Sequence, residues 1–556
     1  MAETEESRAN YLTVGYGHLT APQNSAQEDG QVLAQQCITL IKKQKDPKQF
    51  PPQLLILLVS AAYLEKVDAA NLIDGIQQTF AGYLKDNQMV AGDVPLLGSS
   101  VAAAVFKDPN TGKRVHEEGV LLICLASRLI EAQIGVGTAA RHNPEVATRS
   151  LLGQFELNVK DPNPLADRIL LTFLPGFGDT LGSPPYPARA LHRRLRSGVR
   201  ARIRIAGGVS YVNGSKDKVN TTLFADRELL NDSVIAARIT TGVPVGISLN
   251  HGLTPTGRVV RVAKIGEDKY TIAKFDGHQT PAEVLKEVGG FVMMGKLSTS
   301  EEPQIDVPRV ASDGKSIGFS YEVHKGEHFE FLKPEQERIL QATVNCVRQA
   351  QERILDQRHL AAMIFISNDW RLFYAAAGMD IEQTLDQLEK ETGTPCLGGF
   401  MDGEVGEDNT GRSVFGNSGM TCVVFGDELR ERTPMHHGFR ALAEYATKMS
   451  GTQDIDEAIE EALEIIVQAG FRGGMLSLVL KDGGQEYVKA KHARGKRFRK
   501  IVEETIRLVL NEAQDDEYLV SRVVREARND PAKRGIFIDD ARNPIHGYDQ
   551  PAVQKA

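Results

Sequence analysis

The sequence has little that would suit a secreted, membrane-spanning or zinc-binding protein. Its five cysteines include no CxxC pair, which argues against a disulfide framework and against a cysteine zinc site. The apolar run Leu54–Ala62 is too short to span a bilayer, and the first 30 residues lack the basic and apolar regions of a signal peptide. The sequence therefore predicts a cytoplasmic protein with reduced thiols and no membrane insertion.

Motifs of nucleotide chemistry are missing as well. No GxxxxGKS or GxxxxGKT phosphate loop occurs in the sequence. The formal net charge of −8 at pH 7 argues against nonspecific binding of nucleic acid by the chain as a whole. We therefore predict a protein that is not an enzyme, that binds no nucleic acid and that needs no metal or other cofactor.

The sequence does contain an alternation of apolar strands and amphipathic helices. Leu54–Ser60 and Leu360–Ser367 are typical of buried strands, and Val67–Lys85 and Pro334–Gln357 have apolar residues at helical spacing. Continuous apolar strands between helices indicate a buried sheet in a layered domain. The 556 residues are too many for one ordinary core. The sequence thus predicts an α/β fold, mixed α+β, with more than one domain.

A glycine-rich loop precedes an apolar strand at residues 394–425. Glycines let the backbone turn tightly or come close to a ligand. Glu404 lies in this loop between Gly403 and Gly406, where its carboxylate could accept hydrogen bonds from a ligand ammonium or guanidinium. The alternative is a surface turn whose acidic residues are merely solvated.

Further glycines and one amide are candidates for the same kind of site. Gly398 and Gly399 suit either a turn at the end of a strand or a ligand contact, and Asn417 suits either a turn or an amide that donates to and accepts from a ligand. Gly207 and Gly208 follow an apolar strand and fit either backbone contacts to a ligand or a β-bulge.

Two charged or titratable side chains complete the candidates. His251, in a loop between apolar strands, could ligate haem iron or hydrogen-bond a ligand carboxylate, and the alternative is a structural role in a turn. Arg371 follows the only tryptophan and could hold a carboxylate in bidentate fashion, and the alternative is a stacked surface arginine.

Four segments carry a resemblance to a known family, the FIST sensory domain. They are VPLLGSS at Val94–Ser100, IAGG at Ile205–Gly208, HGLTPTG at His251–Gly257, and Pro395–Glu404 continuing to the strand Asn417–Phe425. They occur in the family's order. The resemblance implies a two-lobed, ligand-binding input module of bacterial signal transduction, with amino acids among the ligands proposed, and it brings haem-based nitric oxide sensing as an alternative.

The C-terminal part resembles part of a GAF domain. Its helix, the hairpin GMLSLVLKDGGQEYVKAKHARG and the stretch VVREARNDPAKRGIFIDDARNP follow the order of that family, while its last strands are missing. The predicted organisation is a disordered tail (1–30), a FIST N-terminal half (31–290), a FIST C-terminal half (291–426), a linker (427–452), a partial GAF-like domain (453–545) and a tail (546–556).

The expected function follows from this resemblance. We expect a sensory protein without an output domain of its own, which binds a polar metabolite such as an amino acid, assembles as a homo-oligomer and passes its signal to a separate signalling or structural protein. A haem-based gas sensor that uses His251 and a non-catalytic scaffold on a FIST fold are the alternatives.

Overall fold

The structure is a computed structural model in which the chain divides into two compact units. One unit ends at Leu429 and the other begins at Arg430, and each is described by itself. The described residues are 11–427 apart from 45–46, 91, 156–166, 177–186, 200–202, 216–217, 278–279, 290–291, 298–303, 307, 312, 320, 355–358 and 409–410, and then 474–482, 485–494 and 507–509.

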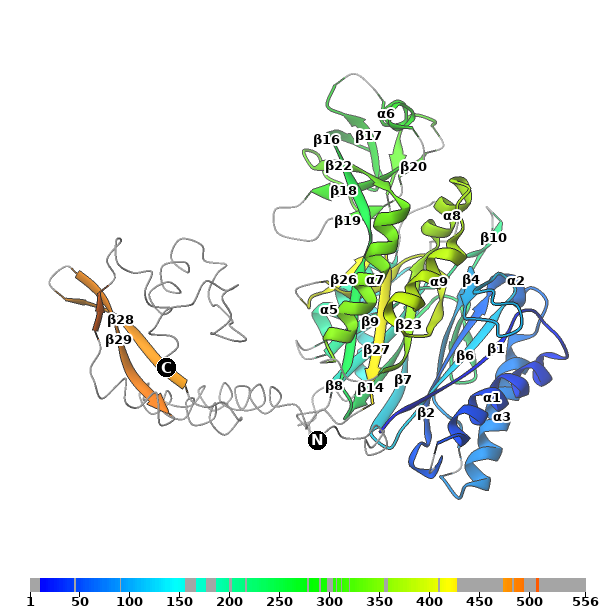
Figure 1. The fold of residues 1–556 in the computed structure, drawn as a ribbon. Helices are drawn as coiled ribbons and strands as arrows, with labels where there is room; N and C mark the ends of the chain where they lie inside the picture. The colour runs from blue at the N-terminus through cyan, green and yellow to red at the C-terminus, as the bar shows by residue number, and fades with distance from the viewer. Residues whose placement is uncertain are drawn as a thin grey trace. The chain divides into compact units, whose positions relative to one another are not determined.

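The first unit is built from three repeats with the same order of elements. Each repeat runs strand, helix, strand, helix, strand, hairpin, strand (Figure 1). Repeat 1 comprises β1 (Thr13–Leu19), α1 (Ala26–Lys42), β2 (Pro52–Ser60), α3 (Ala69–Asp86), β3 (Leu96–Val101), the hairpin β4 (Ala103–Val105) and β5 (Val115–His116), and β6 (Val120–Ala126).

The other two repeats follow the same plan. Repeat 2 comprises β7 (Ile130–Thr138), α4 (Pro144–Gln154), β8 (Asp167–Leu174), α5 (Pro187–Gly198), β9 (Ile203–Val209), the hairpin β12 (Leu223–Ala225) and β13 (Glu228–Leu230), and β14 (Ser233–Thr241). Repeat 3 comprises β15 (Val245–Asn250), α7 (Gln336–Glu352), β23 (His359–Ser367), α8 (Asn368–Ala376), α9 (Ile381–Thr392), β24 (Cys396–Met401), the hairpin β25 (Glu404–Glu407) and β26 (Ser413–Gly416), and β27 (Met420–Gly426).

Each repeat forms one sheet with the same pairing. The orders are β1-β6-β2-β3 in sheet 1, β7-β14-β8-β9 in sheet 2 and β15-β27-β23-β24 in sheet 3. In every sheet the last two strands of this order are parallel, and the others pair antiparallel. The parallel pair is joined through a helix, as a parallel connection requires.

The hairpins leave their own sheets and extend those of their neighbours. The hairpin β12–β13 of repeat 2 pairs with β3 in sheet 1, β25–β26 of repeat 3 pairs with β9 in sheet 2, and β4–β5 of repeat 1 pairs with β24 in sheet 3. Every repeat thus gives one hairpin and receives one. The three exchanges close a ring, so each sheet has six strands from two repeats.

Polar contacts hold two of the exchanged hairpins to a helix or loop of the receiving repeat. Arg114, beside β5, is 5% exposed and forms ion pairs with Asp386 (2.9 Å) and Glu389 (2.6 Å) of α9. Arg227, between β12 and β13, pairs with Asp93 (2.6 Å). The exposed Arg227 pair contributes at most about 1 kcal/mol, whereas removing one partner of a buried pair costs about 3–5 kcal/mol.

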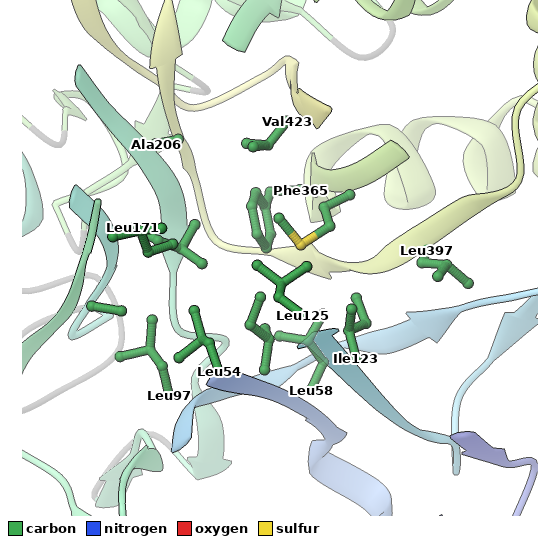
Figure 2. Close-up of a cluster of buried hydrophobic side chains, with 14 of the residues drawn as sticks. Leu54, Leu58, Leu97, Ile123, Leu125, Leu171, Ala206, Phe365, Leu397 and Val423 are labelled. Carbon is green, nitrogen blue, oxygen red and sulfur yellow. The ribbon is translucent and has the colours of Figure 1, made fainter. Parts of the chain in front are cut away.

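The three sheets turn their inner faces toward one shared core. Figure 2 shows side chains from all three sheets in this core: Leu54, Leu58, Leu97, Ile123 and Leu125 from sheet 1, Leu171 and Ala206 from sheet 2, and Phe365, Leu397 and Val423 from sheet 3. Their outer faces pack separately, on α1 and α3 for sheet 1, on α4 and α5 for sheet 2, and on α7, α8 and α9 for sheet 3. The fold is therefore mixed α+β in three layered parts around one centre.

Local sequence explains where the covering helices begin. Ser25 and Glu28 form a capping box before α1, Asp68 caps α3, and Asn143 caps α4, whose first residue is Pro144. These side chains accept hydrogen bonds from backbone N–H groups that have no partner within the helix. The buried residues of α3 recur at helical spacing, so they lie on one face of the helix, and this face packs on the sheet.

Repeat 3 alone carries an insert between its first strand and first helix. The insert, residues 253–334, forms a seven-stranded sheet and one helix around a core of its own, which includes Phe329 and Phe331. Its elements are β16 (Leu253–Ile265), β17 (Thr271–Phe275), α6 (Pro281–Val288), β18 (Met293–Leu297), β19 (Gln304–Asp306), β20 (Arg309–Val310), β21 (Ile317–Gly318) and β22 (His328–Pro334).

Within the second unit the structure describes a three-stranded sheet. β28 (Gly474–Asp482) and β29 (Gln485–Arg494) form the hairpin that the sequence predicted, and β30 (Arg507–Val509) pairs with β29. The other segments of the predicted GAF-like domain lie outside the described residues.

Most elements named from the sequence are present, and one prediction is wrong. The strand at Leu54–Ser60 and the helix at Val67–Lys85 correspond to β2 and α3. The disordered tail predicted for residues 1–30 is contradicted by β1 and by the start of α1. β1 is rich in glycine and polar residues, and it is held as a strand by antiparallel pairing with β6, which the local sequence does not indicate. None of the helices in the described ranges combines the length and apolar character that crossing a bilayer requires.

Candidate functional site

In each repeat a link joins the second strand of the parallel pair to the exchanged hairpin. The three links meet at the end of these parallel strands. Backbone hydrogen bonds join one link to the next: Ala102 donates to Phe400, Val209 to Gly403, and Tyr211 to Ser100. The hydroxyls of Ser100 and Ser210 are 2.8 Å apart. This end of the molecule therefore carries buried polar groups contributed by all three repeats.

Glu404, the first residue of β25, is the most unusual of these groups. Its side chain is completely buried. Its Oε1 accepts a hydrogen bond from the backbone N–H of Ser418 (3.1 Å), and the backbone N–H of Gly419 also acts on the carboxyl. Its Oε2 has no hydrogen-bond partner. A buried polar atom without a partner costs about 1–3 kcal/mol, so Glu404 lowers the stability of the folded protein.

The Glu404 carboxyl is neutral at neutral pH. Burial raises its pKa to about 8, and the nearby carboxyl of Asp369 raises it further, against the two backbone N–H groups, which lower it. Because Oε1 accepts the Ser418 N–H and Oε2 has no partner, the proton belongs on Oε2. Glu404 therefore presents a carboxyl O–H donor that the described residues leave without an acceptor.

The repeats show that the fold itself does not require a carboxyl at this position. In sheet 2, Glu404 of the received hairpin pairs with Gly208 on β9. At the same position in the other two sheets, Leu223 pairs with Ser99 in sheet 1 and Ala104 pairs with Gly399 in sheet 3. Leu223 and Ala104 are both buried in the shared core. Two of the three equivalent positions are apolar, as a core position should be. The third is acidic, which points to a role other than packing.

The residues Gly416–Gly419 form a turn that holds the Glu404 carboxyl, and we call it the GNSG turn. A Cβ on Gly416 would lie 2.4 Å from Glu404 Oε1, and one on Gly419 would lie 2.8 Å from it. Larger residues at either position would therefore displace the carboxyl. The turn is glycine-bounded because the acidic side chain lies directly across its backbone.

Neighbouring elements fix the GNSG turn from several directions. Ser418 Oγ donates to Asp369 Oδ2 (3.1 Å), and Trp370 Nε1 donates to the Ser418 carbonyl (3.0 Å). Ser367 Oγ donates to the Asn417 carbonyl (2.8 Å). Sequence reasoning found Asn417 but missed these α8 residues, because nothing in the local pattern places a helix start beside a turn some 50 residues later.

Two further buried polar atoms near this turn have no partner. They are Thr421 Oγ1, on β27 just after the turn, and Asn368 Oδ1, at the start of α8. Gly406 lies against Thr421, since a Cβ there would be 2.6 Å from Thr421 Oγ1. With Glu404 Oε2, three elements around one turn thus each contribute an unpaired polar atom. A small polar ligand or water could satisfy them.

Several sequence-predicted glycines lie at this site, and their conformations explain the residue choice. Gly208 pairs with Glu404, and the Gly403 carbonyl accepts the N–H of Val209. A Cβ on Gly403 would lie 2.9 Å from Asn417 Oδ1. Gly207 has a φ of 142°, which favours glycine, and a Cβ there would meet a backbone carbonyl at 1.8 Å.

Gly398 and Gly399 lie on β24 beside the received hairpin. They pair with Val105 and Ala104, and a Cβ on Gly398 would be 1.7 Å from the Ile364 carbonyl oxygen. Gly398 has in sheet 3 the position that Gly207 has in sheet 2, so the first glycine of each pair allows close strand packing.

His251 follows β15, and it is the preceding residue, Asn250, that contacts the GNSG turn. The Asn250 carbonyl lies against Gly419, where a Cβ would be 2.7 Å away. Burial lowers the pKa of His251, and its Nδ1 accepts the N–H of Leu253 (3.1 Å). The neutral ring therefore carries its proton on Nε2. An iron-bound histidine instead presents a lone pair there and donates from the other nitrogen, so His251 does not fit an axial haem ligand.

Arg371 and a pair of partly buried arginines form contacts between repeats. Arg371 on α8 forms an ion pair with Glu117 (2.6 Å), in the loop before β6. Sequence reasoning missed Glu407, whose carboxylate accepts from Arg204 (2.7 Å) and Arg353 (2.9 Å) and so joins β9, β25 and α7. These charged groups therefore pair with one another.

One serine pattern in the insert has the spacing of a hydrolase motif. Residues 314–318 read GKSIG, which fits GxSxG. The pattern runs from the turn after β20 into the short strand β21, and Ser316 Oγ donates to Asp313 Oδ2 (2.6 Å). A nucleophile elbow lies between a strand and a helix, so this context does not support one.

Comparisons with known proteins give one family and several distant structural likenesses. No curated protein matches the chain. A cyanuric acid hydrolase from A. caulinodans is 12% identical, with 42% of this chain and 71% of that one covered and a TM-score of 0.22. A chorismatase is 10% identical, with 76% and 99% covered and a TM-score of 0.27. PurLQS from Thermotoga maritima is 10% identical, with 85% and 86% covered and a TM-score of 0.18. Likenesses this weak say nothing about activity.

The family match covers the central part of the N-terminal unit. It extends from β2 to just beyond β17, so it includes Gly207, Gly208 and His251 and ends before Glu404. The FIST domain is generally a small-ligand-sensing domain of signal transduction. Residues 53–278 match the family model of the FIST N domain.

Proposed function

We propose that the protein is a sensor that binds a small polar metabolite at the GNSG turn, with the Glu404 carboxyl as the central contact. One observation carries the proposal: Glu404 is a fully buried carboxyl with an unpaired oxygen at a position where the equivalent residues are Ala104 and Leu223. A residue that costs the fold stability without a packing role is typical of a functional site.

The charges around the turn favour a ligand with a cationic group. Asp369 accepts from Ser418, and Asp306 of the insert accepts from the Asn417 amide (3.2 Å), so two more carboxyls reach the same turn. An ammonium group would take the place of the Glu404 proton and leave a charge-assisted hydrogen bond. An amino acid is thus the ligand class that we propose.

A sensor also needs a second state and a recipient. Ligand binding changes a conformation only if the ligand binds one state more tightly than the other. We propose that the altered state of the first unit is recognised by a separate signalling protein, and that the sensor works as a homo-oligomer.

A thermal-shift screen with the standard amino acids and small amines tests the ligand. A true ligand at about 100 times its Kd raises the free energy of unfolding by about 2.7 kcal/mol and so raises the Tm. It should also change the emission of Trp370, the only tryptophan, whose Nε1 donates to the Ser418 carbonyl (3.0 Å).

The matched variants are Glu404→Gln and Glu228→Gln. Glu404→Gln keeps the shape but cannot become a carboxylate, so an ammonium ligand should lose its Tm shift. Glu228 is exposed on β13, and its substitution should leave the shift unchanged. A shift that survives in Glu404→Gln would place the ligand elsewhere.

A further inference from the structure

The insert touches the GNSG turn and the strand before it. Asp306 on β19 accepts a hydrogen bond from the Asn417 side chain (3.2 Å), and both residues are buried. One step away, the Arg189 guanidinium of α5 lies over the ring of Tyr321 in the insert (4.5 Å) and over that of Phe415 on β26 (5.2 Å). The insert is thus joined to the segment that leads into the turn.

We expect that segment to shift when the Glu404 carboxyl changes its charge or its hydrogen bonds. Glu404 pairs with Gly416, the last residue of β26, and its Oε1 lies too close to Gly416 and Gly419 for either to carry a Cβ. Ionisation of Glu404, or a ligand group placed against it, alters the hydrogen bonds to Ser418 and Gly419. Close packing transmits such a shift to the neighbouring side chain of Asn417.

We propose that the insert, residues 253–334, is the response element of the sensor, and that its attachment to the body is set by the state of the Glu404 carboxyl through the contact between Asn417 and Asp306. This inference rests on the proposed sensory role of Glu404. The insert is suited to the task because it has its own core and so can change its attachment without unfolding. The other two repeats connect the same elements directly and have no such insert.

The proton can replace the unidentified ligand as a probe. The charged groups that reach Glu404 or its turn are Asp369 of α8 and Asp306 of β19, while Arg204 of β9 pairs with Glu407 of β25. Of these, Asp369 acts on the Glu404 pKa. A change from about pH 6.5 to about pH 9.5 therefore ionises the Glu404 carboxyl, whose pKa is about 8.

Two readouts on the full chain test the coupling. Trp370 emission reports on the turn, and hydrogen exchange of peptides from β18 and β19, corrected for the intrinsic pH dependence, reports on the insert. In the wild type both should change with pH, with exchange at β18 and β19 faster by at least about fivefold at the higher pH. In Glu404→Gln neither should change.

The variant Asp306→Ala removes the contact between the insert and the turn while leaving Glu404 in place. This variant should keep the pH-dependent Trp370 emission, while exchange at β18 and β19 should be fast at both pH values. If the wild-type emission changes with pH but exchange at β18 and β19 does not, the coupling is wrong and the ligand site is unaffected. If emission does not change either, the turn does not respond to Glu404 and the coupling is again wrong. The amino-acid screen, which needs neither readout, then decides the proposed function separately.

Discussion

A fragment that ends after residue 290 should fail to fold. It keeps repeats 1 and 2 but loses β23, β24 and β27, against which the hairpin β4–β5 is placed. It also loses β25, which covers the edge of β9. The shared core would lose its third wall, including Phe365 and Val423. We expect the whole free energy of unfolding, about 5–15 kcal/mol for a domain, to be lost.

Circular dichroism melting and backbone hydrogen exchange check this prediction. The fragment should show no cooperative transition and little protection of the strands that are protected in the full chain. A chain that ends at residue 429 is the matched control, because the first compact unit ends there. It should melt cooperatively. Cooperative unfolding of the shorter fragment would mean that the first two repeats are stable without the exchange ring.

Replacing Glu404 by Gln should make the protein more stable, by about 3 kcal/mol at pH 7. The folded-state pKa of Glu404 is about 8, raised from an ordinary value of 4.5. Below about pH 4.5 the carboxyl is neutral in both states and folding pays no penalty. As the pH rises toward 8, the unfolded state releases its proton and the folded state does not, so the wild-type stability falls.

Urea unfolding at about pH 5, 7 and 9 measures this difference. The variant Glu404→Gln cannot titrate, so its advantage should be small at the lowest pH and should grow until the pH passes the folded pKa of about 8. Glu228→Gln, at an exposed position, should show no such trend. Equal stability of wild type and Glu404→Gln at all three pH values would contradict the raised pKa. A gain in stability together with a lost ligand response is the trade-off of a functional residue.

The sequence indicated the elements better than their arrangement. Apolar runs such as Leu54–Ser60 predicted strands because continuous burial leaves a local signal. The exchange of hairpins leaves none, since it depends on residues as distant as Ala104 and Gly399. The three repeats could not be recognised either, because positions that share one place in the fold carry Ala104, Leu223 and Glu404.

The candidate site was predictable only in part for the same reason. The flanking Gly403 and Gly406 marked Glu404, and the structure explains them by the closeness of Gly403 to Asn417 Oδ1 and of Gly406 to Thr421 Oγ1. The acidic residues that reach the turn, Asp306 and Asp369, come from the insert and from α8. Neither lies in a motif, so only the three-dimensional contacts bring them to Glu404.

The ring of exchanged hairpins also sets the order in which the chain can fold during its synthesis. The ribosome makes β4–β5 about 300 residues before β24, the strand that it must join. Loop closure over that length is slow, and the hairpin edge is exposed meanwhile. The first sheet can be completed once repeat 2 has been made, but the third and second sheets wait for repeat 3. The last strands of the first unit therefore complete the sheets begun by its first strands, and a translation product interrupted before repeat 3 would have no finished part larger than one sheet.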